Sequence, residues 1–586
     1  MTQFLKFIFA SCLGTILAFG LVIVFFAVFA AASSESSDVP PSEGILHLRL
    51  DHVVPELTDN VQQQSFDFES TKSIGVNDIV RLIRKAKTDE NIKGILLRTE
   101  VPQLRPATAQ YIADVLQEFR DGSDKFVDAY GNYFTQAGYV IACSADSIRL
   151  NPNGLVDMRG YGMTIPYFKD FSERTGIEFD IYHAGKFKSA VEPYYLTKSS
   201  EANRLQTKKY LQAYHNQLAA TVADQRDISV ERADEIITKG LAQNAGDALD
   251  LGLVDKLEYY EDYEERLQSL LGTKKLNLIE IGTYLNSNPK RTPSSKNKIA
   301  VIYAEGEVAG GGDNRGDINM STFEEVFEKI EKDDKYKAIV LRVNSPGGSA
   351  FTSDIFLQRI KDLQAQGKYV VASFGDYAAS GGYYIAASAD EIVSEPTTLT
   401  GSIGVFSMIP SMNEFFDKHV GIDWDTIGTG NLTFLYSSMI NRTAGDNAIL
   451  QSETERTYHL FKSIVAEGRN MTIEEVDAIG QGRVWSGADA IDIGLVDQLG
   501  TIDDAIALAA EKASYGDDYK VMNFPVIKKT FWEEMLEGMA QTTNIKFGGP
   551  SALESKLSMD ILKIAQEIES ACNEPQARIP FHIPVE

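Results

Sequence analysis

The sequence predicts an α/β protein of two tandem domains from an internal duplication, preceded by one transmembrane helix. The duplication is visible at an offset of 244 positions, where Gly138–Asp146 (GYVIACSAD) aligns with Gly382–Asp390 (GYYIAASAD) at seven of nine positions. Each half alternates short apolar runs with longer stretches of helical periodicity, which favours a parallel α/β arrangement. The transmembrane helix is predicted from residues 7–32, a run of 26 residues without a formal charge.

The apolar run is long enough to act as a membrane anchor. At about 1.5 Å per residue it can cross a bilayer, and it exceeds the apolar region of a typical cleaved signal peptide. Lys6 lies in the short N-terminus (residues 1–6), whereas the linker at 33–43 is acidic. The positive-inside rule therefore predicts a cytoplasmic N-terminus. We expect a single-pass protein of the cell inner membrane with its folded body on the periplasmic side.

The remaining chain divides at a segment rich in Ser, Pro and Asn. We expect an N-terminal repeat domain at 44–285, a linker at 286–297, a C-terminal repeat domain at 298–510 and a C-terminal extension at 511–586 without an assigned role. The first domain is expected to begin with a strand at 44–50. In the second domain, apolar patterning predicts strands at 298–303, 338–343 and 369–373, helices at 323–331 and 355–366, and a further helix beginning at 382.

Composition excludes several classes of function. A formal net charge of −27 argues against nucleic acid as a partner, because phosphate binding needs clustered Lys and Arg. The three cysteines, Cys12, Cys143 and Cys572, are too few and too scattered for a disulfide framework or a metal site. We expect Cys143 to be a small core residue.

Three motifs of the second half contain candidate catalytic residues. Arg342–Ser349 (RVNSPGGS) follows an apolar strand, and its adjacent glycines can leave backbone N–H groups facing a ligand. Ser380 lies in AASGG at a predicted strand-to-helix junction, and Ser402 lies in TGSIG. By themselves, Ser380 could be a helix N-cap and the glycine pair a simple turn. In the repeat alignment Ser380 pairs with Gln136, so the first half has no serine there.

Together these motifs resemble the serine peptidases of family S49, specifically the long, duplicated signal peptide peptidase type, and also Clp protease of the crotonase-like fold. The resemblance covers about residues 44–510 and implies two tandem crotonase/Clp-protease-like domains. It also implies that Ser380 is the nucleophile, that the N–H groups of Gly348 and Gly381 form an oxyanion hole, and that Ser402 orients a catalytic lysine. It implies neither a cofactor nor a metal.

The same resemblance indicates where the general base lies. The family's lysine pattern matches Gly185–Pro193 (GKFKSAVEP) and assigns the base to Lys188. Spacing alone does not separate Lys188 from Lys186, but the family register favours Lys188. The corresponding stretch of the second half contains no lysine, so each half supplies what the other lacks. A Ser-His-Asp triad using His183 is an alternative, although no GxSxG elbow accompanies it.

A lysine base makes a physical demand on the site. An ordinary lysine has a pKa near 10.4 and must be buried, away from acidic partners, to accept a proton at neutral pH. We therefore expect a largely apolar pocket at the interface between the halves.

The expected function is that of a membrane-anchored serine endopeptidase with a Ser-Lys dyad. The resemblance implies that it degrades signal peptides with apolar segments after their release from preproteins, and that it assembles as a homotetramer. One alternative is a non-catalytic membrane-bound scaffold, and another is acyl-CoA chemistry, suggested by fold analogy alone. Neither alternative needs a lysine facing Ser380.

Overall fold

The computed structural model describes residues 43–60, 73–289, 294–311, 316–527 and 576–578. The predicted anchor at 7–32 and the linker that follows it lie outside these ranges. Within them, no helix combines the length and apolar character needed to cross a bilayer.

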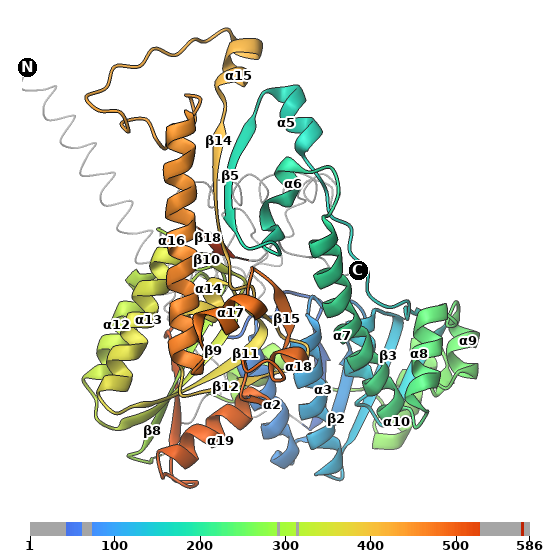
Figure 1. The fold of residues 1–586 in the computed structure, drawn as a ribbon. Coiled ribbons are helices and arrows are strands. Elements are labelled where there is room, and N and C mark those ends of the chain that lie inside the picture. The colour runs from blue at the N-terminus through green and yellow to red at the C-terminus, as the bar shows by residue number, and fades with distance from the viewer. Residues whose placement is uncertain (1–42, 61–72, 290–293, 312–315, 528–575, 579–586) are drawn as a thin grey trace, which may run out of the picture.

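The first half is built on a six-stranded parallel sheet (Figure 1). The strands run in the order β6-β4-β3-β2-β1-β7, and their bounds are β1 (Gly44–Arg49), β2 (Ile92–Arg98), β3 (Phe126–Phe134), β4 (Ser147–Val156), β6 (Lys256–Leu257) and β7 (Leu278–Glu280). Apolar residues run almost continuously through the central strands, as in Ile95–Leu97, which is fully buried. This is the pattern of a parallel sheet covered on both faces.

The second half repeats this arrangement in an eight-stranded sheet. The main path is β15-β13-β11-β9-β8-β17, and β12 and β16 extend from β11. The bounds are β8 (Lys298–Glu305), β9 (Tyr336–Ser345), β11 (Tyr369–Ala379), β12 (Glu391–Ser394), β13 (Leu399–Gly401), β15 (Val484–Ser486), β16 (Gln498–Leu499) and β17 (Lys520–Phe524). The sheet extends past residue 510, where the domain was expected to end, because β17 pairs with β8 as β7 pairs with β1. The prediction of two α/β halves is confirmed.

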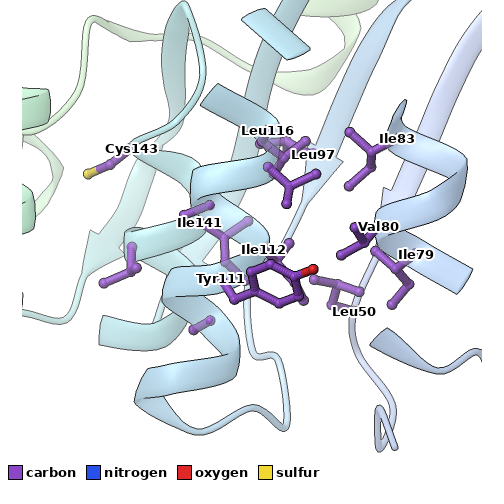
Figure 2. Packing of buried hydrophobic residues seen from close by; sticks show 14 of the residues in the cluster. Leu50, Ile79, Val80, Ile83, Leu97, Tyr111, Ile112, Leu116, Ile141 and Cys143 are labelled. Carbon is purple, nitrogen blue, oxygen red and sulfur yellow. The ribbon is translucent and has the colours of Figure 1, made fainter. Parts of the chain in front are cut away.

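One hydrophobic core joins the two halves. Helices α2 (Val76–Thr88) and α3 (Pro106–Asp121) of the first half and α19 (Ile502–Lys512) of the second contribute to a single cluster of buried side chains, which also includes inward-facing residues of β8 and β9. Figure 2 shows the part of this cluster around α2 and α3. Each fully buried Ile or Leu contributes about 1.5–3 kcal/mol, so separating the halves would be costly.

Cys143 lies in the same core. It is 1% exposed, and burial raises the pKa of its thiol to about 12. The expectation of a small core residue is confirmed by this burial. Because the thiol keeps its proton at neutral pH, it is unreactive there.

A third, four-stranded sheet crosses between the halves in the order β10-β18-β14-β5. Its bounds are β5 (Glu178–Ala184), β10 (Gly347–Ser349), β14 (Val405–Ser411) and β18 (Gln576–Arg578). Strand β5 of the first half pairs antiparallel with β14 of the second along its whole length, from Ala184 with Val405 to Glu178 with Ser411. This ribbon, at the top of Figure 1, brings the end of β5 beside the second half.

Candidate active site

Ser380 lies at the sharp junction between β11 and α14 (Gly381–Ala386). Its backbone has φ 56° and ψ −115°, a conformation that costs a residue with a side chain about 1–3 kcal/mol. Its N–H donates to the Gly401 carbonyl at 2.8 Å, which fixes the turn. Ser380 occupies the N-cap position of α14, but its side chain makes no capping hydrogen bond, so side-chain capping does not account for this serine. The strained turn instead leaves Oγ available to other partners.

Lys188 is held near Ser380 by two close backbone approaches. The chain leaves β5 through Gly185 at φ +106°, where a Cβ atom would lie 2.5 Å from the carbonyl carbon of Gln481. The N–H of Phe187 donates to the Gln481 carbonyl at 2.8 Å. At Gly482, with φ +77°, a Cβ atom would lie 2.6 Å from the backbone nitrogen of Lys188. Glycine at 185 and 482 therefore lets the lysine loop dock directly against the second half.

The three predicted polar side chains meet at one point. Lys188 Nζ donates to Ser380 Oγ at 2.7 Å and to Ser402 at 3.1 Å (Oγ) and 3.3 Å (carbonyl oxygen). Lys188 is 3% exposed, Ser380 is 0% exposed and Ser402 is 1% exposed. Lys186 is exposed, with Nζ 5.0 Å from the ring centre of Phe187. The geometry thus brings together Lys188, Ser380 and Ser402 and leaves Lys186 outside.

His183 does not join this group. Its ring stacks on Tyr195 with the ring centres 6.2 Å apart. Among the described residues, no histidine is hydrogen-bonded to Ser380 Oγ, so the structure gives the triad alternative no support.

The two predicted oxyanion residues lie on adjoining elements. Gly348 is in β10 with φ +152°, and a Cβ atom there would lie 2.2 Å from the carbonyl oxygen of Val308. Gly381 is the first residue of α14, which lies beside β10. At the next position, Gly382, a Cβ atom would lie 2.6 Å from the Ser345 carbonyl oxygen. These contacts pack the glycine turn against the start of the helix that Ser380 precedes.

The equivalent position of the first half has a different role. Gln136 begins α4 (Gln136–Ala142), and its side-chain amide donates to the Gly160 carbonyl at 3.0 Å and accepts from the Gly160 N–H at 2.7 Å. Both polar ends of Gln136 are therefore used to hold a loop. The strained turn of Ser380 is not repeated here, because Thr135 is the N-cap residue of α4 and Gln136 has no positive φ.

Sequence reasoning missed Gln206, which supports the lysine loop. It lies on α7 (Glu201–Gln225), is 2% exposed, and its Nε2 donates to the Phe187 carbonyl at 3.0 Å and to Ser189 Oγ at 2.9 Å. Its Oε1 accepts from the Val484 N–H at 3.1 Å. Gln206 thereby ties the residues flanking Lys188 to the second half. No motif or spacing marks this glutamine in the sequence.

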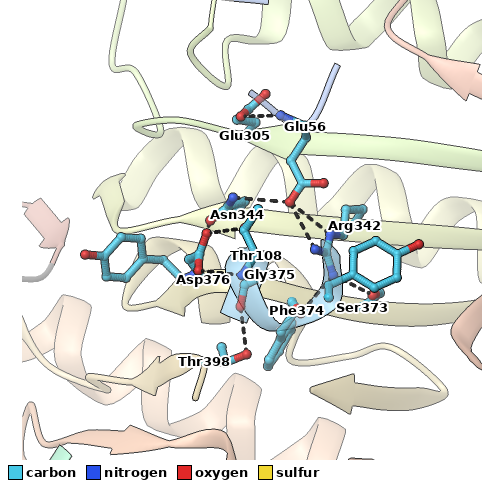
Figure 3. Close-up of polar contacts among 12 residues, drawn as sticks. Glu56, Thr108, Glu305, Arg342, Asn344, Ser373, Phe374, Gly375, Asp376 and Thr398 are labelled. Carbon is cyan, nitrogen blue, oxygen red and sulfur yellow. Dashed lines mark hydrogen bonds and ion pairs between the residues drawn. The ribbon is translucent and has the colours of Figure 1, made fainter. Parts of the chain in front are cut away.

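A buried ion pair anchors the strand that leads to the glycine turn (Figure 3). Glu56 of the first half is 3% exposed, and its Oε1 accepts from Arg342 Nε at 3.1 Å and from Asn344 Nδ2 at 3.2 Å. Arg342, on β9, also donates to Ser373 Oγ at 3.1 Å and to the Phe374 carbonyl at 2.9 Å. The pair therefore links the first half to both β9 and β11, the strands that lead to the glycine turn and to Ser380.

Two further contacts extend this polar network. Asp376 on β11 accepts from the N–H of Thr108 at 3.1 Å and from its hydroxyl at 2.5 Å. Glu305 at the end of β8 accepts from the Glu56 N–H at 2.8 Å, and burial raises the pKa of Glu305 to about 8. Each contact fixes the first half against a strand of the second.

Comparisons with known proteins found a matching family model, related sequences and partly similar solved structures. The sequence model of "Peptidase family S49" matches twice, over residues 118–274 and 362–515. The chain is 32% identical to Protease 4 of Haemophilus influenzae over 536 residues, which cover 87% of this chain and 85% of that protein. A candidate signal peptide peptidase of Enterococcus faecium is 32% identical over 224 residues, 37% of this chain and 65% of that one. Among solved structures, ClpP1 of Listeria monocytogenes is similar with a TM-score of 0.22 and 18% identity, over 34% of this chain and 91% of that chain.

Proposed function

The chain belongs to peptidase family S49 and is a serine peptidase, and from this premise we propose that it is an endopeptidase whose catalytic dyad is Ser380 and Lys188. The observation that carries the proposal is the 2.7 Å contact between Lys188 Nζ and Ser380 Oγ inside the protein. A nucleophilic serine needs a base within hydrogen-bond reach, and Lys188 meets that requirement.

The reaction follows from this contact. Ser380 Oγ attacks the carbonyl carbon of the scissile peptide bond while neutral Lys188 Nζ takes the hydroxyl proton. The tetrahedral intermediate collapses, and the amine leaves with the proton returned from Lys188. A water molecule then gives a proton to Lys188 while its oxygen attacks the acyl carbon. The bond from that carbon to Ser380 Oγ breaks, Lys188 returns the proton to Oγ, and the acid product leaves. Ser402 would orient the lysine through its 3.1 Å contact with Nζ.

The negative charge that develops on the carbonyl oxygen of the scissile bond needs hydrogen-bond donors to stabilise it. The N–H groups of Gly348 and Gly381 are the proposed oxyanion hole, since both glycines adjoin the turn that carries Ser380. Removal of one such donor costs about 3–4 kcal/mol in the transition state of a well-studied serine protease.

The substrates we propose are signal peptides already released from preproteins, with their apolar segments. The name of the Enterococcus faecium relative supports this class. The charge-free run at 7–32 would anchor the enzyme in the inner membrane with its catalytic body on the periplasmic side, close to such substrates. A homotetramer is proposed on family resemblance.

Hydrolysis of a fluorogenic peptide by four proteins tests the dyad. Wild type and Lys186→Ala should hydrolyse the peptide and be labelled by a serine-directed phosphonate, whereas Ser380→Ala and Lys188→Ala should lose hydrolysis by at least about 10²–10⁴-fold. Full activity of either of the last two variants would exclude the dyad. A wild type that neither hydrolyses the peptide nor takes up the label would favour the scaffold alternative.

A further inference from the structure

The turn at residues 480–483 contacts the backbone of both residues that are proposed to act with the nucleophile. Gly482 packs against the backbone of Lys188, where an added Cβ atom would lie 2.6 Å from the lysine nitrogen. The carbonyl oxygen of Arg483 accepts from the Ser402 N–H at 2.7 Å. A displacement of this turn would therefore move both Lys188 and Ser402 relative to the nucleophile.

Gln481 has a backbone conformation that is rare for a residue with a side chain. Its φ is +56°, in the left-handed region, and such a conformation persists where the surrounding contacts fix it. The N–H of Gln481 donates to the hydroxyl of Tyr458 on α16 (Ala444–Arg469) at 3.1 Å. Its side-chain Nε2 donates to Oδ2 of Asp477 on α17 (Ile473–Ile479) at 2.6 Å. Two helices thus hold the residue at the start of the turn.

Asp477 is the centre of this support. Its Oδ1 accepts from the Tyr458 hydroxyl at 2.9 Å and from Lys462 Nζ at 2.7 Å, while Oδ2 accepts from Gln481. Tyr458 and Lys462 both lie on α16. One carboxylate therefore receives hydrogen bonds from α16 at one oxygen and from the turn at the other, and it ties the turn to two helices at once.

The first half contains the same turn without this role. An offset of 242 positions aligns ALDLGLVD of the first half with AIDIGLVD of the second and places Gly240 opposite Gly482. Gly240 also has a positive φ (+56°), but the nearest atom to an added Cβ would lie 3.9 Å away. In place of the aspartate and Gln481, the first half has Glu235 and Lys239, a solvent-exposed ion pair. The close contact with a lysine loop is thus a property of the turn in the second half.

We propose that Asp477 and Gln481 are positioning residues, which hold Lys188 and Ser402 at the distances from the nucleophile that proton transfer requires. The inference rests on the proposed function, because it concerns the same base. Both residues act through the turn at 480–483 and not on the reacting atoms. A misplacement of reacting groups by about 1 Å costs about 10²-fold in rate. Loss of the bond between Asp477 and Gln481 should therefore lower kcat and leave KM little changed.

An exchange of charge between the two positions tests this role in the full-length protein. Gln481→Glu sets a second carboxylate against that of Asp477, and kcat for a fluorogenic peptide should fall by about 10- to 100-fold with little change in KM. The double variant Asp477→Asn/Gln481→Glu has the net charge of wild type and restores one donor and one acceptor in exchanged places. It should recover most of kcat. Unchanged kcat in Gln481→Glu, or no recovery in the double variant, would overturn the proposal.

A matched control lies on α13 (Ala350–Ala365). There Gln358 Nε2 donates to Asp362 Oδ1 at 2.8 Å on an exposed surface, and the two residues are also four positions apart. Gln358→Glu makes the same chemical change away from the turn and should hydrolyse the peptide like wild type. An equal loss of kcat in Gln358→Glu and Gln481→Glu would mean that the added charge, and not the turn, lowers the rate.

A labelling measurement separates this inference from the proposed function. Ser380→Ala and Ser380→Ala/Gln481→Glu are treated with formaldehyde and cyanoborohydride, and mass spectrometry measures methylation of Lys188 and of the exposed Lys186 in the same loop. Faster methylation of Lys188 in the double variant, at unchanged Lys186, supports the positioning role whether or not the enzyme hydrolyses peptides. Equal methylation of Lys188 in both proteins contradicts it. Absence of hydrolysis by the wild type would count against the proposed function alone.

Discussion

Lys188 Nζ lies 2.7 Å from Ser380 Oγ although 192 positions separate the two residues in the chain and they belong to different halves of the duplication. The pairing of β5 with β14 makes this contact possible, because it carries the end of β5 into the second half. Neither half alone can form the pair. The interface between the halves is therefore part of the proposed active site.

Replacing Lys188 by arginine separates a catalytic role from a structural one. Lys188→Arg keeps a positive charge and several N–H donors, but a guanidinium is protonated at all accessible pH values and cannot act as a base. We expect kcat to fall by about 10²–10⁴-fold, with no recovery between pH 7 and 10. Steady-state hydrolysis of a fluorogenic peptide measures the effect, with Lys186→Arg as the control. An active Lys188→Arg enzyme would mean that the lysine only supports the fold.

The oxyanion turn should tolerate no side chain at Gly348. In Gly348→Ala, the new Cβ atom would lie 2.2 Å from the Val308 carbonyl oxygen, so β10 must shift and move its N–H. We expect kcat/KM to fall by about 10²–10³-fold, as when one oxyanion donor is lost. The matched control is Gly367→Ala, which also has a positive φ (+82°) but has no neighbour within 4 Å of the added Cβ. Similar losses of activity in both variants would point to general destabilisation.

The buried pair of Glu56 and Arg342 should contribute strongly to the docking of the two halves. Glu56→Ala would leave the Arg342 guanidinium, 2% exposed, without the carboxylate that lies 3.1 Å away. Breaking a buried pair in this way costs about 3–5 kcal/mol. Urea denaturation should show that loss of unfolding free energy, and Glu56→Gln should lose less because it keeps an acceptor. The control is Glu118→Ala, whose contact with Arg84 is solvent-exposed and worth less than about 1 kcal/mol. Equal effects of Glu56→Ala and Glu118→Ala would rule out this role.

Much of the fold could be predicted because its signals are local or repeated. The strand over Ala338–Val343 and the helix over Ile355–Gln366 follow from apolar runs and periodicity, and the structure has β9 at Tyr336–Ser345 and α13 at Ala350–Ala365. The alignment of the two halves singled out Ser380, because the first half has Gln136 at the equivalent position. The comparison of the halves also marked the lysine motif, since the second half lacks a lysine there.

The residues that hold the site in place could not be predicted. Gln206 and Glu56 act through contacts with Val484 and Arg342 that lie 278 and 286 positions away in the chain. A single polar residue in a helix or loop has no periodic signature, and only the folded chain shows that its partners are buried. The strand at Gln576–Arg578 was missed for the same reason, because three residues are too few to show alternation.

The carboxyl group of Glu395 should make stability depend on pH. Glu395 is 4% exposed, and its Oε1 has no hydrogen-bond partner among the described residues. Burial raises the pKa of Glu395 from 4.5 to about 8, against the opposing charge of Arg342. Between these two values the folded protein holds a proton that the unfolded chain has lost. The contribution of this group to stability therefore falls as the pH rises from about 4.5 to 8 and is constant above that range.

Glu395→Gln removes this effect, because its side chain stays neutral. Relative to wild type, the variant should gain about 1–3 kcal/mol of unfolding free energy at pH 8 and little at pH 5. Urea denaturation at pH 5, 6, 7 and 8 measures the difference between the two proteins at each pH. Glu474→Gln, an exposed position on α17 (Ile473–Ile479), should follow wild type throughout. If the difference between Glu395→Gln and wild type were the same at every pH, Glu395 would titrate identically in the folded and unfolded states, and its burial would have no consequence for stability in this range.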